Sequence, residues 1–486
     1  HRDLHSFPTR RSSDLPKARV SYLAFWPDAL GREQARADYG TNAAAAFSRP
    51  ANPPARSDIV LVTSTLYNQA GEAYETTDPA GRKLRLTFDQ AGRLTSRIED
   101  HGTSPALNRE TTFTYNLDGR LRYLTAKNTV TGDQITKFVY GTTLANSDIA
   151  TNDLLRGKIY PDSTDPDNPL SGTDHVEMKY NRLGEVREIK DQLGTIHTLS
   201  YDKLGRLTDD DVTTFGTGVD QTIKKISRTY EARGMLDKIT SRNAAATIIN
   251  EVQFSYNDFG LPSQEAQEHA GAVAGGSLKV QYAYTDGSAN HTRLTTLTYP
   301  DGRTTTFDFG SAGSAEDLLS RVASLKQSTT VLADYSYLGR DEIVIAGYSG
   351  QPGVELTYFT SGGSGDAGDQ YTGLDRFSRV IDQRWRKTSD NTDRERVKYG
   401  FDRVSNRIWR QNTVAGTGQD EFYTYDTLNQ IKTLKRGTLT GTPPTGIAGT
   451  PSWEEQFTYD PSGNWNGATT GYKTLVSGST TLDQNR

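Results

Sequence analysis

The residues that could do chemistry in this 486-residue chain are one glycine-rich string, scattered carboxylates and seven histidines. Residues 363–368 read Gly-Ser-Gly-Asp-Ala-Gly. This matches the dinucleotide fingerprint, in which a helix N-terminus approaches a pyrophosphate. The following residues, 369–373, read Asp-Gln-Tyr-Thr-Gly and are poor material for starting a helix. We therefore interpret the string as a flexible loop rather than a nucleotide site.

Two acidic clusters could offer oxygen ligands to a cation. Asp162, Asp165, Asp167 and Asp174 lie close together in the sequence, but they lack the Gly and the distal Glu of an EF-hand loop. We interpret this cluster as a solvated loop, with an adventitious cation site as the alternative. The run at 209–211, three consecutive Asp residues, is interpreted as a charged turn.

Other catalytic patterns are missing from the sequence. No His-Glu-x-x-His, Gly-x-Ser-x-Gly or Gly-Lys-Ser/Thr motif occurs. The chain has no Cys, which excludes a disulfide scaffold, a thiolate zinc site and a Cys nucleophile. We therefore predict no catalytic residue, no metal and no cofactor. A glycosidase with two paired carboxylates stays open as an alternative, because any β protein rich in Asp and Glu could bring two of them together.

Composition narrows the class of protein further. With Gly counted and Tyr left out, the apolar share is about 38%, below the roughly 45–50% of ordinary domains. Yet 16 Phe, 25 Tyr and 5 Trp are too many for a disordered chain. A net charge of −5 with mixed signs argues against a nucleic-acid partner, and no apolar run is long enough to span a membrane. A thin, surface-rich fold accounts for these values.

One short phrase recurs along the chain: an aromatic residue, Asp or Asn, two variable residues and Gly, often followed by Arg and Leu. Seven copies begin with Phe or Tyr. About 0.5 copies are expected by chance from the residue counts, so the repeat is significant. The predicted turn residues, including two intervening Asp-x-x-Gly copies, are Tyr67, Asn68, Gly71, Asp78, Gly81, Phe88, Asp89, Gly92, Tyr115, Asn116, Gly119, Tyr180, Asn181, Gly184, Asp191, Gly194, Tyr201, Asp202, Gly205, Tyr256, Asn257, Gly260, Tyr459, Asp460 and Gly463.

The phrase predicts a hairpin turn. Asp or Asn at the first position caps backbone N–H groups of a type I turn, and Gly at the fourth accepts a positive φ. The flanks, such as 83–88 and 251–256, alternate apolar and polar residues, which predicts strands with one buried and one solvated face. In looser copies Ser405 and Asn429 stand where Gly would be. The fold class is therefore all-β, a series of hairpins that must pair into a long antiparallel sheet.

These repeats resemble the Rhs/YD-repeat proteins, which include bacterial polymorphic toxins, shell subunits of Tc toxin complexes and teneurins. The resemblance covers roughly Val20 to Trp465 and rests on repetition rather than on one copy. It implies a wide spiralling sheet that forms part of a hollow shell around a C-terminal toxin domain. The family's core segment, with its self-cleavage aspartates, is not found before Arg486, so no catalytic residue is carried over.

The expected organisation has four parts. Residues 1–16 are interpreted as foreign or disordered, 17–62 as the start of the repeat region, 63–465 as the repeat sheet and 466–486 as a truncated Ser/Thr/Gly-rich tail. The expected function is a non-catalytic wall of a shell that holds or delivers a C-terminal effector. The expected location is secreted or at the cell surface. The alternative is a surface adhesin or carbohydrate-binding β-repeat protein, with a glycan or receptor as its partner.

Overall fold

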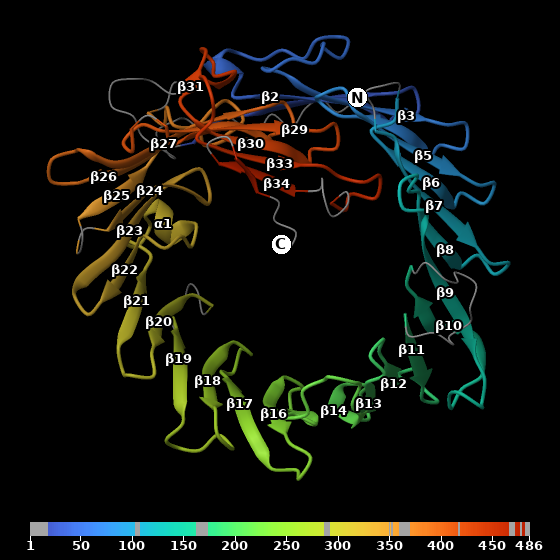
Figure 1. The fold of residues 1–486 in the computed structure, drawn as a ribbon. Helices are drawn as coiled ribbons and strands as arrows, with labels where there is room; N and C mark the ends of the chain where they lie inside the picture. The colour runs from blue at the N-terminus through green and yellow to red at the C-terminus, as the bar shows by residue number, and fades with distance from the viewer. Residues whose placement is uncertain are drawn as a thin grey trace. The chain divides into compact units, whose positions relative to one another are not determined.

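The structure is a computed structural model. It describes residues 18–102, 107–161, 174–285, 292–348, 350, 353–358, 370–416, 418–465, 472–476 and 479–481. Within these residues, 33 strands belong to one sheet and neighbouring strands along the chain pair antiparallel (Figure 1). The prediction of an all-β fold with one long antiparallel sheet is confirmed. In this part of the chain no helix is long and apolar enough to cross a membrane.

The chain divides into two compact units. Unit 1 comprises His1–Thr111, Lys127–Gly132 and Asp308–Arg486, and unit 2 comprises Thr112–Ala126 and Asp133–Phe307. We call residues 18–111 and 127–132 of unit 1 the early arm, and residues 308–465 the late arm. Strands β7 and β21 cross from one unit to the other.

The strands of the early arm are β1 (Tyr22–Pro27), β2 (Glu33–Gly40), β3 (Leu61–Tyr67), β4 (Ala73–Thr77), β5 (Lys83–Phe88), β6 (Leu94–Glu99) and β7 (Arg109–Tyr115), with a 3₁₀ turn at Asn42–Ala44. Unit 2 contains β8 (Leu121–Ala126), β9 (Gln134–Thr142), β10 (Thr151–Ile159), β11 (His175–Tyr180), β12 (Val186–Lys190), β13 (Ile196–Tyr201), β14 (Leu207–Thr214), β15 (Lys225–Tyr230), β16 (Leu236–Arg242), β17 (Ile248–Tyr256), β18 (Pro262–Glu268), β19 (Leu278–Tyr284), β20 (Leu294–Thr298) and β21 (Thr304–Asp308).

The rest of unit 1 contains α1 (Ala315–Leu318), β22 (Ser324–Gln327), β23 (Thr330–Leu338), β24 (Glu342–Tyr348), β25 (Val354–Thr357), β26 (Asp382–Lys387), β27 (Asp393–Phe401), β28 (Arg407–Asn412), β29 (Asp420–Tyr425), β30 (Ile431–Gly437), β31 (Leu439–Thr440), β32 (Gly446–Ile447), β33 (Trp453–Phe457), β34 (Tyr472–Val476) and β35 (Ser479–Thr481). Strands β31 and β32 form a separate two-stranded sheet.

The register shifts at the aromatic residue that precedes many of the turns. In the β13–β14 hairpin Ser200 pairs with Asp209, but Tyr201 pairs with Leu207. The same one-residue shift occurs before Tyr230, Tyr256 and Tyr425. It is the bulge expected where a type I turn is followed by a residue of positive φ. The bulge aims each aromatic ring back along the sheet.

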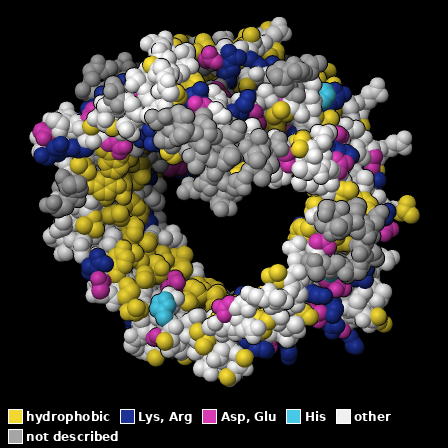
Figure 2. All heavy atoms as spheres, in the orientation of Figure 1, with side chains coloured by type: hydrophobic (Ala, Val, Ile, Leu, Met, Phe, Trp, Pro, Cys, Tyr) yellow, Lys and Arg dark blue, Asp and Glu magenta, His cyan; other side chains and the backbone are white. Residues whose placement is uncertain are grey.

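Few apolar side chains are fully buried among the residues that the structure describes. The accessible surface is 28090 Å², against about 17,800 Å² expected for a compact monomer of this mass. One small core in the early arm contains Trp26 and Val62, and another in the late arm contains Val344 and Leu374. Figure 2 shows apolar side chains gathered over β22 to β24 on the viewed face. The low apolar content of the sequence therefore corresponds to a sheet that buries little apolar surface.

The prediction of a solvated polar face on each strand is wrong at several acidic positions. Glu251 on β17 is buried. It accepts hydrogen bonds from the Thr240 hydroxyl at 2.7 Å and the Lys238 ammonium at 3.1 Å, both on the neighbouring strand. The backbone N–H of Val273, in the loop after β18, donates to it at 3.1 Å. Side chains of the neighbouring strand and the loop after β18 thus cover Glu251, although the alternation of polar and apolar residues predicts that this face of β17 is solvated.

Candidate functional site: the Tyr-Asp turn and the seam of unit 1

The recurring structural site is the turn that follows an aromatic strand end, which we call the Tyr-Asp turn. In the copy at Asp202 the backbone N–H of Gly205 donates to the Asp202 carbonyl at 3.0 Å. Asp202 Oδ1 accepts from the N–H groups of Leu204 at 2.8 Å and Arg206 at 3.0 Å. Asp202 Oδ2 accepts from Arg206 Nε at 2.7 Å. Gly205 has a φ of +76°, which a residue with a side chain rarely adopts.

The sequence-predicted residues lie at such turns. Tyr67, Phe88, Tyr115, Tyr180, Tyr201 and Tyr256 end β3, β5, β7, β11, β13 and β17, and Tyr459 follows β33. Each fourth-position glycine has a positive φ: Gly71, Gly81, Gly92, Gly119, Gly184, Gly194, Gly205, Gly260 and Gly463. Each first-position residue accepts the N–H of that glycine: Asn68, Asp78, Asp89, Asn116, Asn181, Asp191, Asp202, Asn257 and Asp460. The turns at Asp78 and Asp191 follow a non-aromatic residue and lie at the opposite ends of their strands.

The Asp and Arg of the turn form a matched pair. The hydrogen bond from Arg206 and those from backbone N–H groups lower the pKa of the Asp202 carboxyl. The Arg93 side chain and backbone have the same effect on the pKa of Asp89. Asn is tolerated at the first position because its amide oxygen accepts the same backbone bonds. Where the first residue is Asp and an Arg lies four residues later, the guanidinium donates a further, charge-assisted hydrogen bond to the Asp carboxylate.

Arg206→Gln is expected to move the acid unfolding transition to slightly higher pH. The folded-state pKa of Asp202 is lowered, so its ionised form contributes stability above the unfolded-state pKa and loses it as the pH falls through the folded-state pKa. Without Arg206 that folded-state pKa rises, and the loss begins at higher pH. Circular dichroism during acid titration measures the shift. The exposed Arg182→Gln is the matched control, and equal transitions for both variants contradict the assignment.

The tyrosine hydroxyl explains why Tyr is preferred over Phe before these turns. Tyr201 donates to the Val186 carbonyl at 2.7 Å, and Tyr230 donates to the Leu207 carbonyl at 2.9 Å. In each case the acceptor is the first residue of the strand that follows the preceding Tyr-Asp turn. The same bond runs from Tyr67 to Glu33, Tyr256 to Leu236, Tyr425 to Arg407 and Tyr459 to Ile431, at 2.7–3.0 Å. Successive hairpins are therefore linked by a side-chain bond as well as by the sheet ladder.

Tyr201→Phe is expected to lower the free energy of unfolding by about 1 kcal/mol, because the part-buried hydrogen bond to the Val186 carbonyl is lost while the ring packing stays. Burial raises the pKa of the Tyr201 hydroxyl, which agrees with a group held out of water. Urea unfolding of both proteins measures the difference. Tyr282→Phe, for which the described residues show no hydroxyl partner, is the control and should change little.

The late arm contains Tyr-Asp turns that the sequence pattern did not fully identify. Asp375 follows Leu374 rather than an aromatic residue, but we include its turn because it has the same set of bonds as Asp202, including one from Arg379 Nε at 2.7 Å. Its fourth position is Ser378, with a φ of +59°. Ser405 and Asn429 take φ values of +68° and +65° at the same position. A sequence search that requires Gly at the fourth position does not find these copies. The Asp-to-Arg spacing is the signal that finds the turn at Asp375.

These late turns contact the early arm, which is more than 300 residues away in sequence. Figure 1 shows the blue early arm and the orange late arm next to each other, and hydrogen bonds join their loops and turns. The backbone N–H of Thr41 donates to the Arg376 carbonyl at 2.8 Å, and Arg376 donates to the Ile59 carbonyl at 3.2 Å. The Arg403 guanidinium lies 2.6 Å from the Asp58 carboxylate. We call this set of contacts the seam.

The seam continues along the next two late turns. The Thr427 hydroxyl bonds to the Asp100 carboxylate. Asn128 Nδ2 donates to Asp460 Oδ2 at 2.9 Å and to Ser462 Oγ at 3.1 Å. Asn128 is 2% exposed and Asp460 is 8% exposed, so this is the most buried polar contact of the seam. The late turns that begin at Asp375, Asp402, Asp426 and Asp460 thus all contact the early arm, the first two at the loop that contains Asp58 and Ile59.

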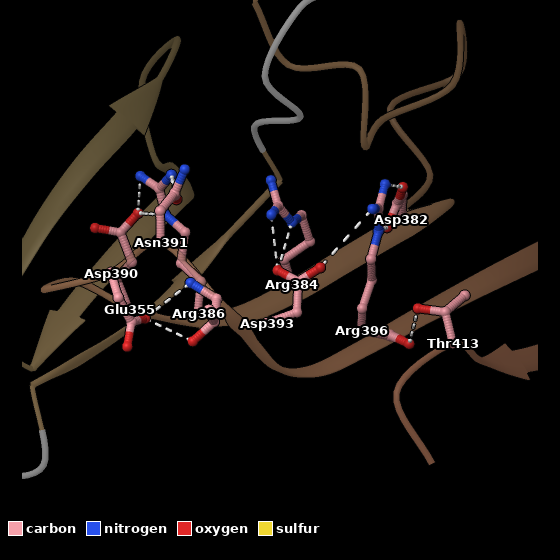
Figure 3. Close-up of polar contacts among 10 residues, drawn as sticks. Glu355, Asp382, Arg384, Arg386, Asp390, Asn391, Asp393, Arg396 and Thr413 are labelled. Carbon is pink, nitrogen blue, oxygen red and sulfur yellow. Dashed lines mark hydrogen bonds and ion pairs between the residues drawn. The ribbon is translucent and has the colours of Figure 1, made fainter. Parts of the chain in front are cut away.

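Charged side chains on β25 to β27 form a network of ion pairs, which Figure 3 shows. Arg384 lies opposite Arg396 across the strands. Asp382 lies 2.6 Å from Arg396, and Asp393 lies 2.7 Å from Arg384. The hydrogen bond with Asp382 raises the pKa of Arg396, although burial opposes this. Each acid has a guanidinium partner, so the network is suited to holding strands together rather than to proton transfer.

The other candidate groups have structural partners or lie outside the described residues. The string at 363–368 and Asp162, Asp165 and Asp167 are outside them. The run at 209–211 is wrong as a turn, because it lies within β14. There the three carboxylates pair with Lys225, His197 and Lys224 at 2.7–2.9 Å, which makes three charges tolerable in one strand. Among the described residues, no three His, Asp or Glu side chains lie close enough to hold a metal.

Comparison with known proteins places this geometry in context. No family model and no curated protein matches the sequence. Among solved structures, the Tc holotoxin pore of Photorhabdus luminescens with a mutated TccC3 aligns over 94% of this chain at 13% identity, with a TM-score of 0.51. A TcdB2-TccC3 crystal structure aligns over 95% at 13% identity, with a TM-score of 0.52. The form without the hypervariable C-terminal region aligns over 94% at 13% identity, with a TM-score of 0.52.

The chain spans about a quarter of the length of those solved chains, 25–26%. At this level of identity the likeness is one of fold. It extends over the early arm, unit 2 and the late arm, the same stretch over which the Tyr-Asp turns recur. The chain therefore has the repeat-sheet fold seen in TcdB2-TccC3 of Tc toxins, and its resemblance to Rhs/YD-repeat proteins is confirmed as a likeness of fold.

Proposed function

We propose that this chain is a non-catalytic structural region that forms part of the wall of an Rhs-type shell, which encloses or delivers a C-terminal effector. The observation that carries the proposal is the series of hairpins joined by Tyr-Asp turns that recurs through the described residues. Its fold is shared with TcdB2-TccC3 over nearly the whole chain. The side chains that hold this series together carry the function, because a wall needs continuity and strength rather than a reactive group.

The arrangement of charges supports a scaffold. The carboxylates of Asp202 and Asp382 are each paired with a guanidinium group, from Arg206 and Arg396. Partnered carboxylates of this kind stabilise turns and strand pairs. We propose on the same grounds that 17–62 begins the repeat region, that 63–465 is the repeat sheet and that 1–16 is not part of it. The expectation that 466–486 is only a tail is wrong for β34 and β35, which continue the sheet by pairing with β33 and with each other.

The proposed partner is an effector domain of the full-length protein, and the proposed location is secreted or at the cell surface. DNA sequencing of the gene on both sides of the region tests the proposal. We expect further Tyr-Asp repeats and a core segment followed by a variable C-terminal domain. A stop codon or a surface anchor shortly after Arg486 would contradict the shell and favour the adhesin.

A glycan array with the purified chain provides a second test. A shell wall should bind no glycan specifically, because its aromatic residues are used within the sheet. Tyr201 and Tyr256, for example, direct their hydroxyls to backbone carbonyls. Specific, saturable binding to one glycan would contradict the shell function and support the adhesin.

A further inference from the structure

The third residue of the Tyr-Asp turn is a contact residue in the late arm. Phe377 lies against Gly40, so that a methyl group added to that glycine would be 3.1 Å from the Phe377 ring. Leu428 lines a pocket of 430 Å³ together with Leu107 and Val130 of the early arm. The first and fourth residues close the turn by hydrogen bonds, whereas the side chain of the third residue lies against the neighbouring segment.

In unit 2 the same position carries large apolar residues that are exposed. Leu183 is 80% exposed, Leu204 is 78% exposed and Phe259 is 67% exposed. Their turns join β11 to β12, β13 to β14 and β17 to β18, so they lie along the same end of neighbouring hairpins. A single exposed Leu requires no explanation, but recurrence at one turn position does. The turn itself does not need an apolar residue there, since Arg233 occupies the position in the intervening hairpin.

The second position of the turn is basic in two turns of the seam and in two turns of unit 2. In the late arm this position holds Arg376 and Arg403, which bind the Ile59 carbonyl and the Asp58 carboxylate of early-arm loops. In unit 2 it holds Arg182 and Lys203, both exposed. The turns at 375 and 402, which contact the early arm, have a basic residue at the second position and an apolar residue at the third. The exposed turns at 181 and 202 have the same two residue types at these positions.

We infer that the turn tips at 181–184, 202–205 and 257–260 form an interaction surface that binds the strand-connecting loops of a second copy of this chain. The seam shows which partner fits such tips, namely the loops at the opposite strand ends of the same kind of hairpin. Every copy carries such loops, and exposed acids on them, such as Asp220, complement Arg182 and Lys203. Because the two contacting surfaces differ, the association is head-to-tail and can continue beyond two copies.

Sedimentation velocity of the purified 486-residue chain tests this inference. We expect the average mass to rise with protein concentration, and to rise less at high salt, since screening weakens the contacts of Arg182 and Lys203. A triple variant with Leu183→Ser, Leu204→Ser and Phe259→Ser should keep the mass of a single copy at all concentrations. The matched control is Phe25→Ser, Leu66→Ser and Leu332→Ser, which removes three partly exposed apolar residues from strands instead of turns. It should associate as the wild type does.

The inference is overturned if the wild type stays a single copy throughout, or if the turn variant associates as strongly as the wild type. It is also overturned if the strand control loses association equally, because the effect is then general surface hydrophobicity. Circular dichroism of each variant verifies that the fold is retained. Phosphatidylcholine and phosphatidylglycerol vesicles are included, and vesicle binding without self-association would assign the tips to a membrane. None of these results depends on the gene sequence that tests the proposed function.

Discussion

Asn128→Asp is expected to lower the free energy of unfolding by about 3 kcal/mol at pH 7, because it places a second carboxylate beside a buried one. Asn128 Nδ2 now lies 2.9 Å from Asp460 Oδ2, and both residues are almost fully buried. The new carboxylate can still accept the N–H groups of Val130 and Thr131, which bond to Asn128 Oδ1 at 2.9 and 3.2 Å. The change therefore isolates charge repulsion across the seam from loss of the local turn.

The pH dependence identifies the cause of this loss. Two neighbouring carboxylates raise the folded-state pKa of at least one of them, so the folded variant binds a proton more tightly than the unfolded chain. The deficit relative to wild type is then present in full at neutral pH and shrinks as the pH falls through that raised pKa. Urea unfolding at several pH values measures it. Asn128→Ala is the control without a charge, and a deficit that does not change with pH would contradict the contact between the two side chains.

Gly40→Ala is expected to destabilise unit 1 by about 3 kcal/mol, the second large effect. Gly40 has a φ of +55°, which strains any other residue. An added methyl group would lie 2.1 Å from the Arg376 carbonyl oxygen, which is the acceptor of the Thr41 N–H. The late turn must therefore move away, and the seam loses a backbone hydrogen bond as well as its close packing.

Gly31→Ala is the matched control for this prediction. Gly31 also has a positive φ, +82°, but nothing lies within 4 Å of the added methyl group. It should cost only the conformational strain, about 1–2 kcal/mol. Thermal unfolding of the two variants separates strain from the seam contact. Equal losses would show that Gly40 has no close neighbour in the late arm.

The hairpins were predictable because their determinants are local. The period-two pattern of 83–88 and the Asp89-to-Gly92 spacing lie within ten residues, and each turn is closed by its own side chains. The all-β class follows from repeating this unit. The turn at Asp375 was missed because Ser378 replaces Gly and Leu374 replaces the aromatic residue, although the Asp-to-Arg spacing is retained.

The seam could not be predicted from the sequence. Asp58 and Arg403 are 345 residues apart and carry no local signature that pairs them. The tyrosine bond to the preceding repeat was also hidden, because alternation indicates that a ring is packed but not where its hydroxyl points. The buried Glu251 was assigned to solvent for a related reason. Its cover comes from Lys238, Thr240 and the loop at Val273, which a one-strand pattern does not contain.

Chemical cross-linking tests the central claim most directly, namely that the first and last repeats of the chain are held together by the Tyr-Asp turns of the late arm. The absence of Cys from the sequence allows Asp58→Cys and Arg403→Cys to be the only two thiols. With a short bis-maleimide we expect rapid cross-linking within one molecule, detected by mass spectrometry of linked peptides. Asp58→Cys with Arg182→Cys is the control, because Arg182 lies outside the seam. A cross-link yield for the seam pair no higher than for the control would contradict the account.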